Sequence, residues 1–340
     1  MLTQKIFWSR IVAAAAILLL TMAVCAAVGS VPVRLADVFD GPMRNGQINT
    51  AYEIIVTYRL TRIVLAAVIG AALATAGCVF QAILRNPLAD PYLLGVSSGA
   101  GLGTMAAVLF GWTWSLWGIS AMMPTAFVGA LLTSGLVWLL GRSTGRHHTG
   151  LILAGVVVNA FFSAVMMFLT SIARADQIQT MQFWMMGNIA AMQRFEVIVP
   201  AAAIVAFGVV RLTQWGPPLN MLTFGADDAA SLGLSVPRTA VSVFAIAALI
   251  TAVAVCLSGL IGFVGLIVPH AVRLAAGPDH RQLIPISALM GGAFVVLADS
   301  VARVVVAPAM LPVGVVTALV GGPFFLILLV RCRKRLNWGL

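Results

Sequence analysis

The chain has 340 residues, of which 61% are hydrophobic and only 9% are charged. This composition excludes a soluble globular domain and indicates a polytopic membrane protein. The formal net charge is +10, but the basic residues are scattered over many loops, so anionic lipid headgroups rather than nucleic acid are the expected partner.

Successive apolar runs predict an all-α integral membrane protein, with about ten transmembrane helices in a single polytopic domain over residues 1–340. A membrane-spanning helix needs about 20 apolar residues, and the runs approach that length between short polar breaks. A transmembrane β-barrel would show weakly alternating segments of about ten residues instead. The spans are expected near residues 11–29, 62–84, 92–110, 118–140, 149–171, 197–212, 239–257, 259–275, 282–299 and 312–330.

The first predicted span follows the basic start MLTQKIFWSR and ends in the small residues of AVCAAVGS. A basic start and small residues after an apolar run are also typical of a signal peptide. The segment is therefore either a cleaved leader or, if uncleaved, the first membrane span.

The distribution of basic residues predicts the orientation in the membrane. If the spans alternate and the amino terminus is inside, the outer side holds, of the 20 lysines and arginines, only Arg34, Arg44, Arg59, Arg62, Arg174, Arg194 and Arg303. The remaining basic residues fall inside, which is the pattern of the positive-inside rule. Both termini are therefore expected in the cytoplasm.

The stretch RNPLADPYLLGVSSGAG, residues 85–101, is a polar interruption between the second and third predicted spans. Pro87 and Pro91 prevent a continuous helix. We therefore expect Arg85 to Asp90 to form a turn on the cytoplasmic side.

Three glycines follow this turn at helical spacing. Gly95, Gly99 and Gly103 fall at i, i+4 and i+8, interleaved with Ser97 and Ser98. Such a stripe lets the backbone of another helix approach closely. Alternatively, small residues with hydroxyl groups could line a passage, and periodicity alone does not separate the two interpretations.

Two connections between spans are long enough to suggest a function of their own. One is the outer segment from Gly29 to about Thr61. The other is the inner segment TQWGPPLNMLTFGADDAASLGLSVPRT, residues 213–239.

The residues that would support other chemistries are missing from the sequence or badly spaced. The four cysteines form no CxxC pair and the histidines no HExxH motif, so a metal site is not expected. Neither lysine, Lys5 or Lys334, lies in a GxxxxGK(S/T) loop, so the chain is not expected to hydrolyse ATP. Every acidic residue can be placed in a loop or at a span end, which disfavours an ion-coupled secondary transporter, kept here as the alternative of a different class.

RNPLADPYLLGVSSGAGLG resembles the most characteristic segment of the FecCD family, the permease subunits of ATP-driven importers for iron-siderophore complexes, haem and cobalamin. The resemblance covers nearly the whole chain and keeps the order of the motifs. Its other segments are YRLTRIVLAAVIGAALATAGCVFQ at 58–81, FWMMGNIA at 183–190, GLIGFVGLIVPHAVRLAAGPDHRQLIP at 259–285 and ADSVARVVVAPAMLPVGVVTALVGGPFFLILL at 298–329.

The resemblance implies an assembly in a bacterial or archaeal cytoplasmic membrane. Permeases similar to this chain form a homodimer with the translocation pathway at the subunit interface. Two ATP-binding subunits, which hold ATP and Mg²⁺, lie on the cytoplasmic side, and one substrate-binding protein lies outside. Import of an iron chelate is the first expectation, either a ferric siderophore or haem, and cobalamin import is the alternative.

The resemblance also implies roles for residues at both sides of the membrane. We expect ion pairs between acidic residues of the binding protein and Arg59, Arg62 and Arg303. An arginine at a helix end can also simply extend to the membrane–water interface. Asp299, four residues before Arg303, would orient or neutralise that arginine.

On the cytoplasmic side, the resemblance implies a gate and a coupling surface. The gate residues are Asn86, Leu88, Ser143 and Thr144, although Asn86 could instead only cap its turn. The inner segment 213–239 is expected to form two short coupling helices for the ATPase. Their candidate residues are Gly225, Asp227, Asp228, Ala229, Ala230 and Gly233.

Overall fold

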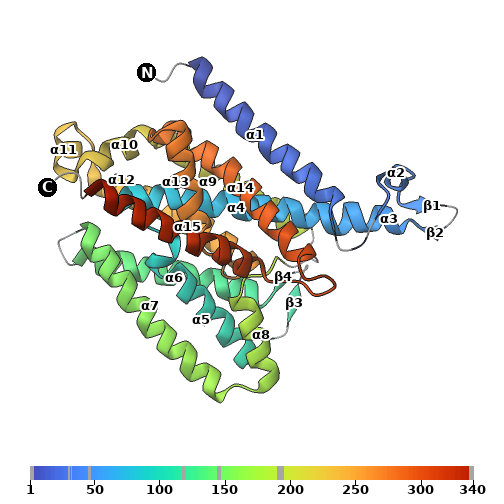
Figure 1. Cartoon of the computed structure of the whole chain (residues 1–340). Coiled ribbons are helices and arrows are strands. Elements are labelled where there is room, and N and C mark those ends of the chain that lie inside the picture. The colour runs from blue at the N-terminus through green and yellow to red at the C-terminus, as the bar shows by residue number, and fades with distance from the viewer. Residues whose placement is uncertain are drawn as a thin grey trace.

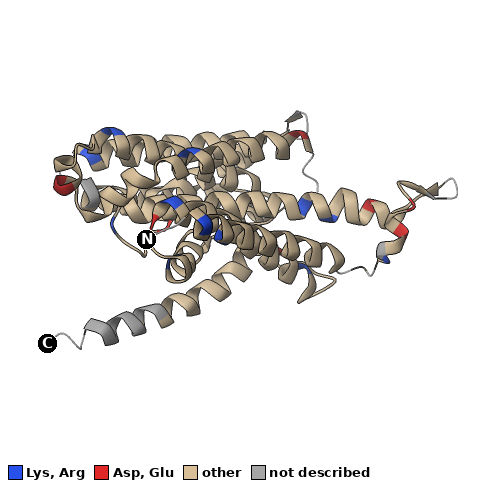
Figure 2. Cartoon of the chain, turned by 90° about the horizontal axis from the view of Figure 1, so that it is seen from above, with Lys and Arg blue, Asp and Glu red and all other residues tan. Residues whose placement is uncertain are grey.

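The computed structural model describes residues 4–29, 31, 33–44, 47–112, 114–116, 119–143, 147–189 and 195–336 of the chain. It is a bundle of helices with two very short β-hairpins (Figure 1). Most of the ribbon in Figure 2 carries neither acidic nor basic residues, as expected of helices that face lipid.

Among the described residues, seven helices are long and apolar enough to cross a membrane, and three apolar helices are shorter. Together they match the ten predicted spans in order, which confirms the predicted fold class. The long helices are α1 (Gln4–Ala27), the continuous helix Thr50–Ile83, α6 (Met122–Ser143), α7 (His147–Ile172), α9 (Phe195–Gln214), α12 (Val236–Ser258) and α14 (His280–Val304). The shorter ones are α5 (Val96–Leu109), α13 (Val264–Ala276) and the apolar part Val313–Ile327 of α15 (Val313–Leu336).

The bundle has two opposite ends, which we call the terminal end and the hairpin end. Helix α1 begins and α15 ends at the terminal end, where the short helices α10 (Gly216–Phe224) and α11 (Ala226–Ser231) also lie (Figure 1). At the opposite, hairpin end lie α2 (Leu35–Val38), β1 (Met43–Arg44), β2 (Gln47–Ile48) and α3 (Thr50–Tyr52). The second hairpin, β3 (Ser115–Leu116) with β4 (Ile119–Ser120), and α8 (Ala175–Met185) connect longer helices.

Helix α4 (Thr61–Ile83) is the centre of the bundle, and most of its residues are buried. Small residues let its neighbours approach at backbone distance: a Cβ on Gly70 would lie 2.1 Å from the carbonyl oxygen of Gly291 in α14. A Cβ on Gly77 would likewise lie 1.9 Å from the carbonyl oxygen of Gly265 in α13. Close approach of this kind maximises van der Waals packing where lipid offers no hydrophobic gain.

The prediction that the outer connection extends from Gly29 to about Thr61 is wrong for its second half. Helix begins at Thr50 and runs through α3 and the π-helix η1 (Glu53–Leu60) into α4. Asn49 fixes this start, because its side chain accepts from the backbone N–H groups of Ala51 and Tyr52, at 3.2 and 3.4 Å, and donates to the Asp37 carbonyl. The hydropathy pattern missed the extension because it carries Glu53 and Arg59.

The inner segment 213–239 contains two short helices, as the resemblance implied. Pro217 and Pro218 lie in the first turn of α10, where proline is tolerated. Gly225, with φ of 154°, separates α10 from α11, and Gly233, with φ of 87°, ends the segment after α11. Both backbone conformations are ones that favour glycine.

Candidate functional site

The characteristic segment enters the bundle instead of remaining at its end. Arg85 lies at the terminal end, where its Nε donates to the Leu222 carbonyl of α10 at 3.0 Å. Six residues later, Pro91 packs against Gly265: a Cβ there would lie 2.7 Å from Pro91 Cδ and 2.9 Å from the carbonyl oxygen of Leu73, near the middle of α4. We call residues 85–95 the re-entrant segment.

The turn predicted for Arg85 to Asp90 is present, but the depth of the segment corrects the prediction that the third span begins near residue 92. The chain turns at the terminal end but has reached mid-bundle by Pro91. A short 3₁₀ helix, η2 (Pro91–Leu94), follows there, and α5 begins only at Val96. The prolines predicted the break in the helix, but a local pattern carries no information on depth.

Hydrogen bonds hold the tip of the re-entrant segment. Asp90 caps η2 by accepting from the Tyr92 N–H at 2.9 Å. The Tyr92 hydroxyl donates to the carbonyl of Ile261 at 2.9 Å and accepts from its N–H at 2.8 Å. The tip is therefore joined to the connection between α12 and α13, and a phenol that is both donor and acceptor satisfies both backbone groups.

Asn159 of α7 is a further polar contact that the sequence interpretation missed. Its Nδ2 donates to the Tyr92 carbonyl at 3.1 Å, and its Oδ1 accepts from Ser98 Oγ at 2.6 Å. The signal was an asparagine within the otherwise apolar run LILAGVVVNAFF, because polar residues inside a span rarely lack a partner.

The glycine stripe lies against α6. A Cβ on Gly99 would lie 2.4 Å from the carbonyl oxygen of Gly129, and one on Gly103 would lie 2.2 Å from that of Thr125. This is the geometry of close helix packing, the first of the two interpretations. Gly95 lies outside α5 as its left-handed N-cap, with φ of 81°, and Ser97, half-buried, lies in the first turn of α5.

Two of the predicted gate residues, Asn86 and Ser143, make local hydrogen bonds in the described structure. Asn86 accepts from the Leu88 N–H at 3.0 Å, so it does cap its turn. Ser143 ends α6 on the surface and donates to the Leu140 carbonyl at 2.7 Å. Thr144 lies outside the described residues, and the gate stays a prediction.

The three predicted docking arginines are buried. Arg59, Arg62 and Arg303 are only 5–6% exposed, and Asp299 is fully buried between the last two. Arg62 Nε donates to both carboxylate oxygens of Asp299, at 2.8 and 3.0 Å, and Arg303 Nε lies 3.1 Å from Oδ2. Arg59 donates to the carbonyls of Ala26 and Val31.

We call Arg62, Asp299 and Arg303 the arginine cluster. It joins the start of α4 to the last turn of α14, near the hairpin end. Since the guanidinium groups already have partners within the chain, contact with an acidic binding protein stays a prediction. The contact between Asp299 and Arg303 agrees with their i, i+4 spacing, whereas the contact with Arg62, from a distant part of the sequence, could not be inferred.

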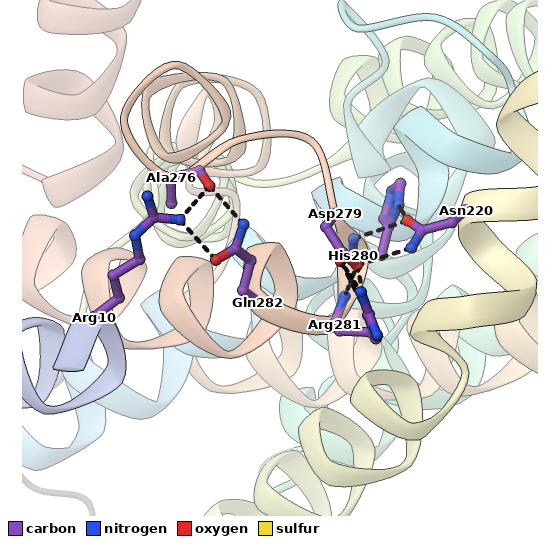
Figure 3. A network of polar contacts seen from close by, with 7 residues as sticks. All are labelled: Arg10, Asn220, Ala276, Asp279, His280, Arg281 and Gln282. Carbon is purple, nitrogen blue, oxygen red and sulfur yellow. Dashed lines mark hydrogen bonds and ion pairs between the residues drawn. The ribbon is translucent and has the colours of Figure 1, made fainter. Parts of the chain in front are cut away.

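A second polar cluster lies at the start of α14, at the terminal end (Figure 3). Asp279 caps α14, accepts from Asn220 Nδ2 of α10 at 2.8 Å and pairs with the Arg281 guanidinium at 2.5 Å. Asn220 Oδ1 lies 2.9 Å from the backbone N and 2.7 Å from Nδ1 of His280. Burial raises the pKa of Asp279, but hydrogen bonds from Arg281 and Asn220 outweigh it and lower the pKa from 3.8 to about 2.

The same turn is held from its other side by α1. Arg10 Nη1 donates to the Ala276 carbonyl at 2.7 Å and to Gln282 Oε1 at 2.9 Å. Gln282 Nε2 donates to the same carbonyl at 2.5 Å (Figure 3). The end of α13 and the start of α14 are therefore bonded to each other, and both are bonded to Arg10.

The predicted coupling residues form an exposed tip beside this cluster. Asp227 and Asp228 lie on the surface in the first turn of α11, Ala230 and Gly233 are exposed, and Ala229 is buried. The sequence interpretation missed two large apolar side chains on the same tip: Phe224 is 77% and Leu232 is 67% exposed. Exposed apolar groups on one surface are typical of a contact with another protein.

In the described part of the chain, ten apolar helices surround a re-entrant segment that is irregular except for η2, and these features define a polytopic membrane protein. Irregular backbone at membrane depth occurs only where it is buried in protein or lines a pathway. Residues 17–331 match the model of the FecCD transport family. The chain belongs to the FecCD transport family.

Similar proteins cover most of the chain. It is 43% identical to the cobalamin import system permease protein BtuC of Halobacterium salinarum over 296 residues, 87% of this chain and 78% of that protein. It is 37% identical to the hemin transport system permease protein HmuU of Yersinia pestis over 319 residues, 93% and 95% of the two chains. A solved structure of a metal-chelate type ABC transporter in an inward-facing conformation matches with a TM-score of 0.82 and 29% identity, over 97% of this chain and 100% of that one.

The arginine cluster predicts a large effect of one isosteric substitution. Asp299→Asn removes the charge that two buried guanidinium groups share, and breaking a buried pair of this kind costs about 3–5 kcal/mol. The unfolding temperature of the purified protein in detergent should fall markedly.

The matched control is Asp176→Asn. Asp176 lies 3.3 Å from Arg174, but both side chains are more than two-thirds exposed, so its loss should change the unfolding temperature little. Equal small shifts for the two variants would contradict a structural role for the buried cluster.

Proposed function

We propose that this chain is the membrane-spanning permease subunit of an ATP-driven importer for a metal chelate, with an iron chelate, either a ferric siderophore or haem, as the first candidate. The observation that carries the proposal is membership of the FecCD transport family over residues 17–331. The similarity to a metal-chelate type ABC transporter over 97% of the chain supports it.

The energy for transport would come from a partner chain. This sequence has no GxxxxGK(S/T) loop with which to bind ATP, so two ATP-binding subunits would hold ATP and Mg²⁺. The tip of α10 and α11 carries exposed Phe224 and Leu232 beside two carboxylates. This surface of each permease copy would contact one ATP-binding subunit.

The remaining parts of the assembly follow from the same family. Two copies of the chain would form the pathway between them, in a bacterial or archaeal cytoplasmic membrane, with the terminal end in the cytoplasm. A substrate-binding protein would deliver the chelate at the hairpin end. The excess of basic residues in the loops assigned to the cytoplasm supports this orientation.

Cobalamin is the second candidate substrate, because one similar permease, 43% identical, is named for cobalamin import. An ion-coupled mechanism has less support: Asp299 is shared by two arginines, and Asp90 caps η2. The buried Asp299 is therefore not an isolated proton or ion site.

Reconstitution in proteoliposomes tests the function. The permease, its ATPase and its binding protein should together take up a ferric siderophore or haemin when ATP is present. The substrate-loaded binding protein should also stimulate ATP turnover. Uptake of cobalamin alone would transfer the assignment to the second candidate, and uptake driven by an ion gradient without ATP would overturn the importer proposal.

The coupling surface predicts a docking defect. Phe224→Ala combined with Leu232→Ala should weaken association with the ATPase about tenfold or more, since central apolar contacts carry most interface energy. Retention of the ATPase on the immobilised permease measures this. Phe39→Ala is the control, because Phe39 is 91% exposed at the opposite end; equal retention by both variants would remove the tip from the interface.

A further inference from the structure

Helix α10 is joined to the bundle by few polar contacts, and one side chain makes most of them. Asn220 donates to Asp279 at 2.8 Å and accepts from the backbone N–H of His280 at 2.9 Å. A carboxamide offers a donor and an acceptor at once, so it can bind a capping carboxylate and a helix N–H together. His280 is only 3% exposed, and both bonds are partly buried.

The group that Asn220 contacts is the first turn of α14. That turn is itself fixed to the end of α13 and to α1 through Gln282 and Arg10. Backbone contact adds to this: a Cβ on Gly216, at the start of α10, would lie 2.9 Å from the backbone nitrogen of Arg281. Any displacement of α10 must therefore move the start of α14 or break these contacts.

Helix α14 crosses the whole bundle. Its 25 residues span about 37 Å at 1.5 Å per residue. Its far end carries Asp299, which pairs with Arg62 of α4 and with Arg303 of α14 itself. One helix thus has a polar attachment at each end: to α10 at the terminal end and to the start of α4 near the hairpin end.

We propose that Asn220 is a positioning residue that couples α10 to α14, so that movement of α10 against its ATPase is passed along α14 to the other end of the bundle. This inference rests on the proposed function, because it requires an ATPase docked on the tip of α10 and α11. Asn220 itself contacts neither ATP nor substrate. Its contribution is a rigid attachment between two helices.

The test uses the reconstituted complex and compares uptake per ATP hydrolysed. Asn220→Asp keeps the shape of the side chain but removes the donor and faces Asp279 with a second carboxylate. Assembly and basal ATP hydrolysis should stay within about twofold of wild type, while uptake per ATP falls about tenfold, within the range of measured coupling energies. Thr223→Val, an exposed change on the same helix, removes only a hydrogen bond to the Asn220 backbone carbonyl and touches neither Asp279 nor His280, so uptake per ATP should stay unchanged.

A paired variant separates coupling from a general loss of stability. Asn220→Asp combined with Asp279→Asn exchanges the amide donor and the carboxylate acceptor between the two positions and retains an acceptor for the His280 N–H. This double variant should therefore restore much of the wild-type uptake per ATP. Asn220→Ser, which is uncharged and too short to make both bonds, should lower the ratio as Asn220→Asp does and serves if the charged variant does not fold.

Two outcomes would overturn the inference. One is an unchanged ratio in Asn220→Asp and Asn220→Ser. The other is a fall in assembly and basal hydrolysis in the same proportion as uptake, which would make Asn220 a purely structural residue. Absence of ATP-dependent uptake in the wild-type complex would instead overturn the proposed function, and this inference with it.

Discussion

The structure depends on satisfying backbone polar groups where neither water nor a regular helix can do so. The re-entrant segment is irregular except for the short 3₁₀ helix η2, yet it passes Leu73 near the middle of α4. Its carbonyl and N–H groups would be costly there without partners. Asp90, Tyr92 and Asn159 supply them, each by bonding backbone of the segment itself or of the connection between α12 and α13.

Two further features follow from this buried segment. Helices α5 and α13 both begin beside it, which is why they are shorter than the full spans around them. Space for the segment comes from small residues, since Pro91 occupies the volume that a side chain at Gly265 would fill. Two charged clusters lie at opposite ends of α14, and their carboxylates, Asp279 and Asp299, each have cationic or amide partners.

Much of the fold could be predicted from the sequence, because apolar runs of membrane-spanning length are a strong signal. The depth of the re-entrant segment could not, since prolines mark a break without saying where in the bundle it lies. The site was predicted unevenly. The pattern of basic residues predicted that Arg62 and Arg303 lie at helix ends. Their burial depends on Asp299, which is distant from Arg62 in sequence. Phe224 and Leu232 were missed because single apolar residues in a polar loop carry no periodicity.

The most direct test of this account measures the depth of the re-entrant segment by thiol accessibility. In a cysteine-free background in nanodiscs, where both faces are open to reagent, Pro87→Cys and Ala89→Cys place single thiols two residues apart. Pro87 is exposed and Ala89 is fully buried. A membrane-impermeant maleimide should modify the thiol at position 87 readily and the thiol at position 89 hardly at all. Equal rates at the two positions would show a simple surface turn and would contradict the account.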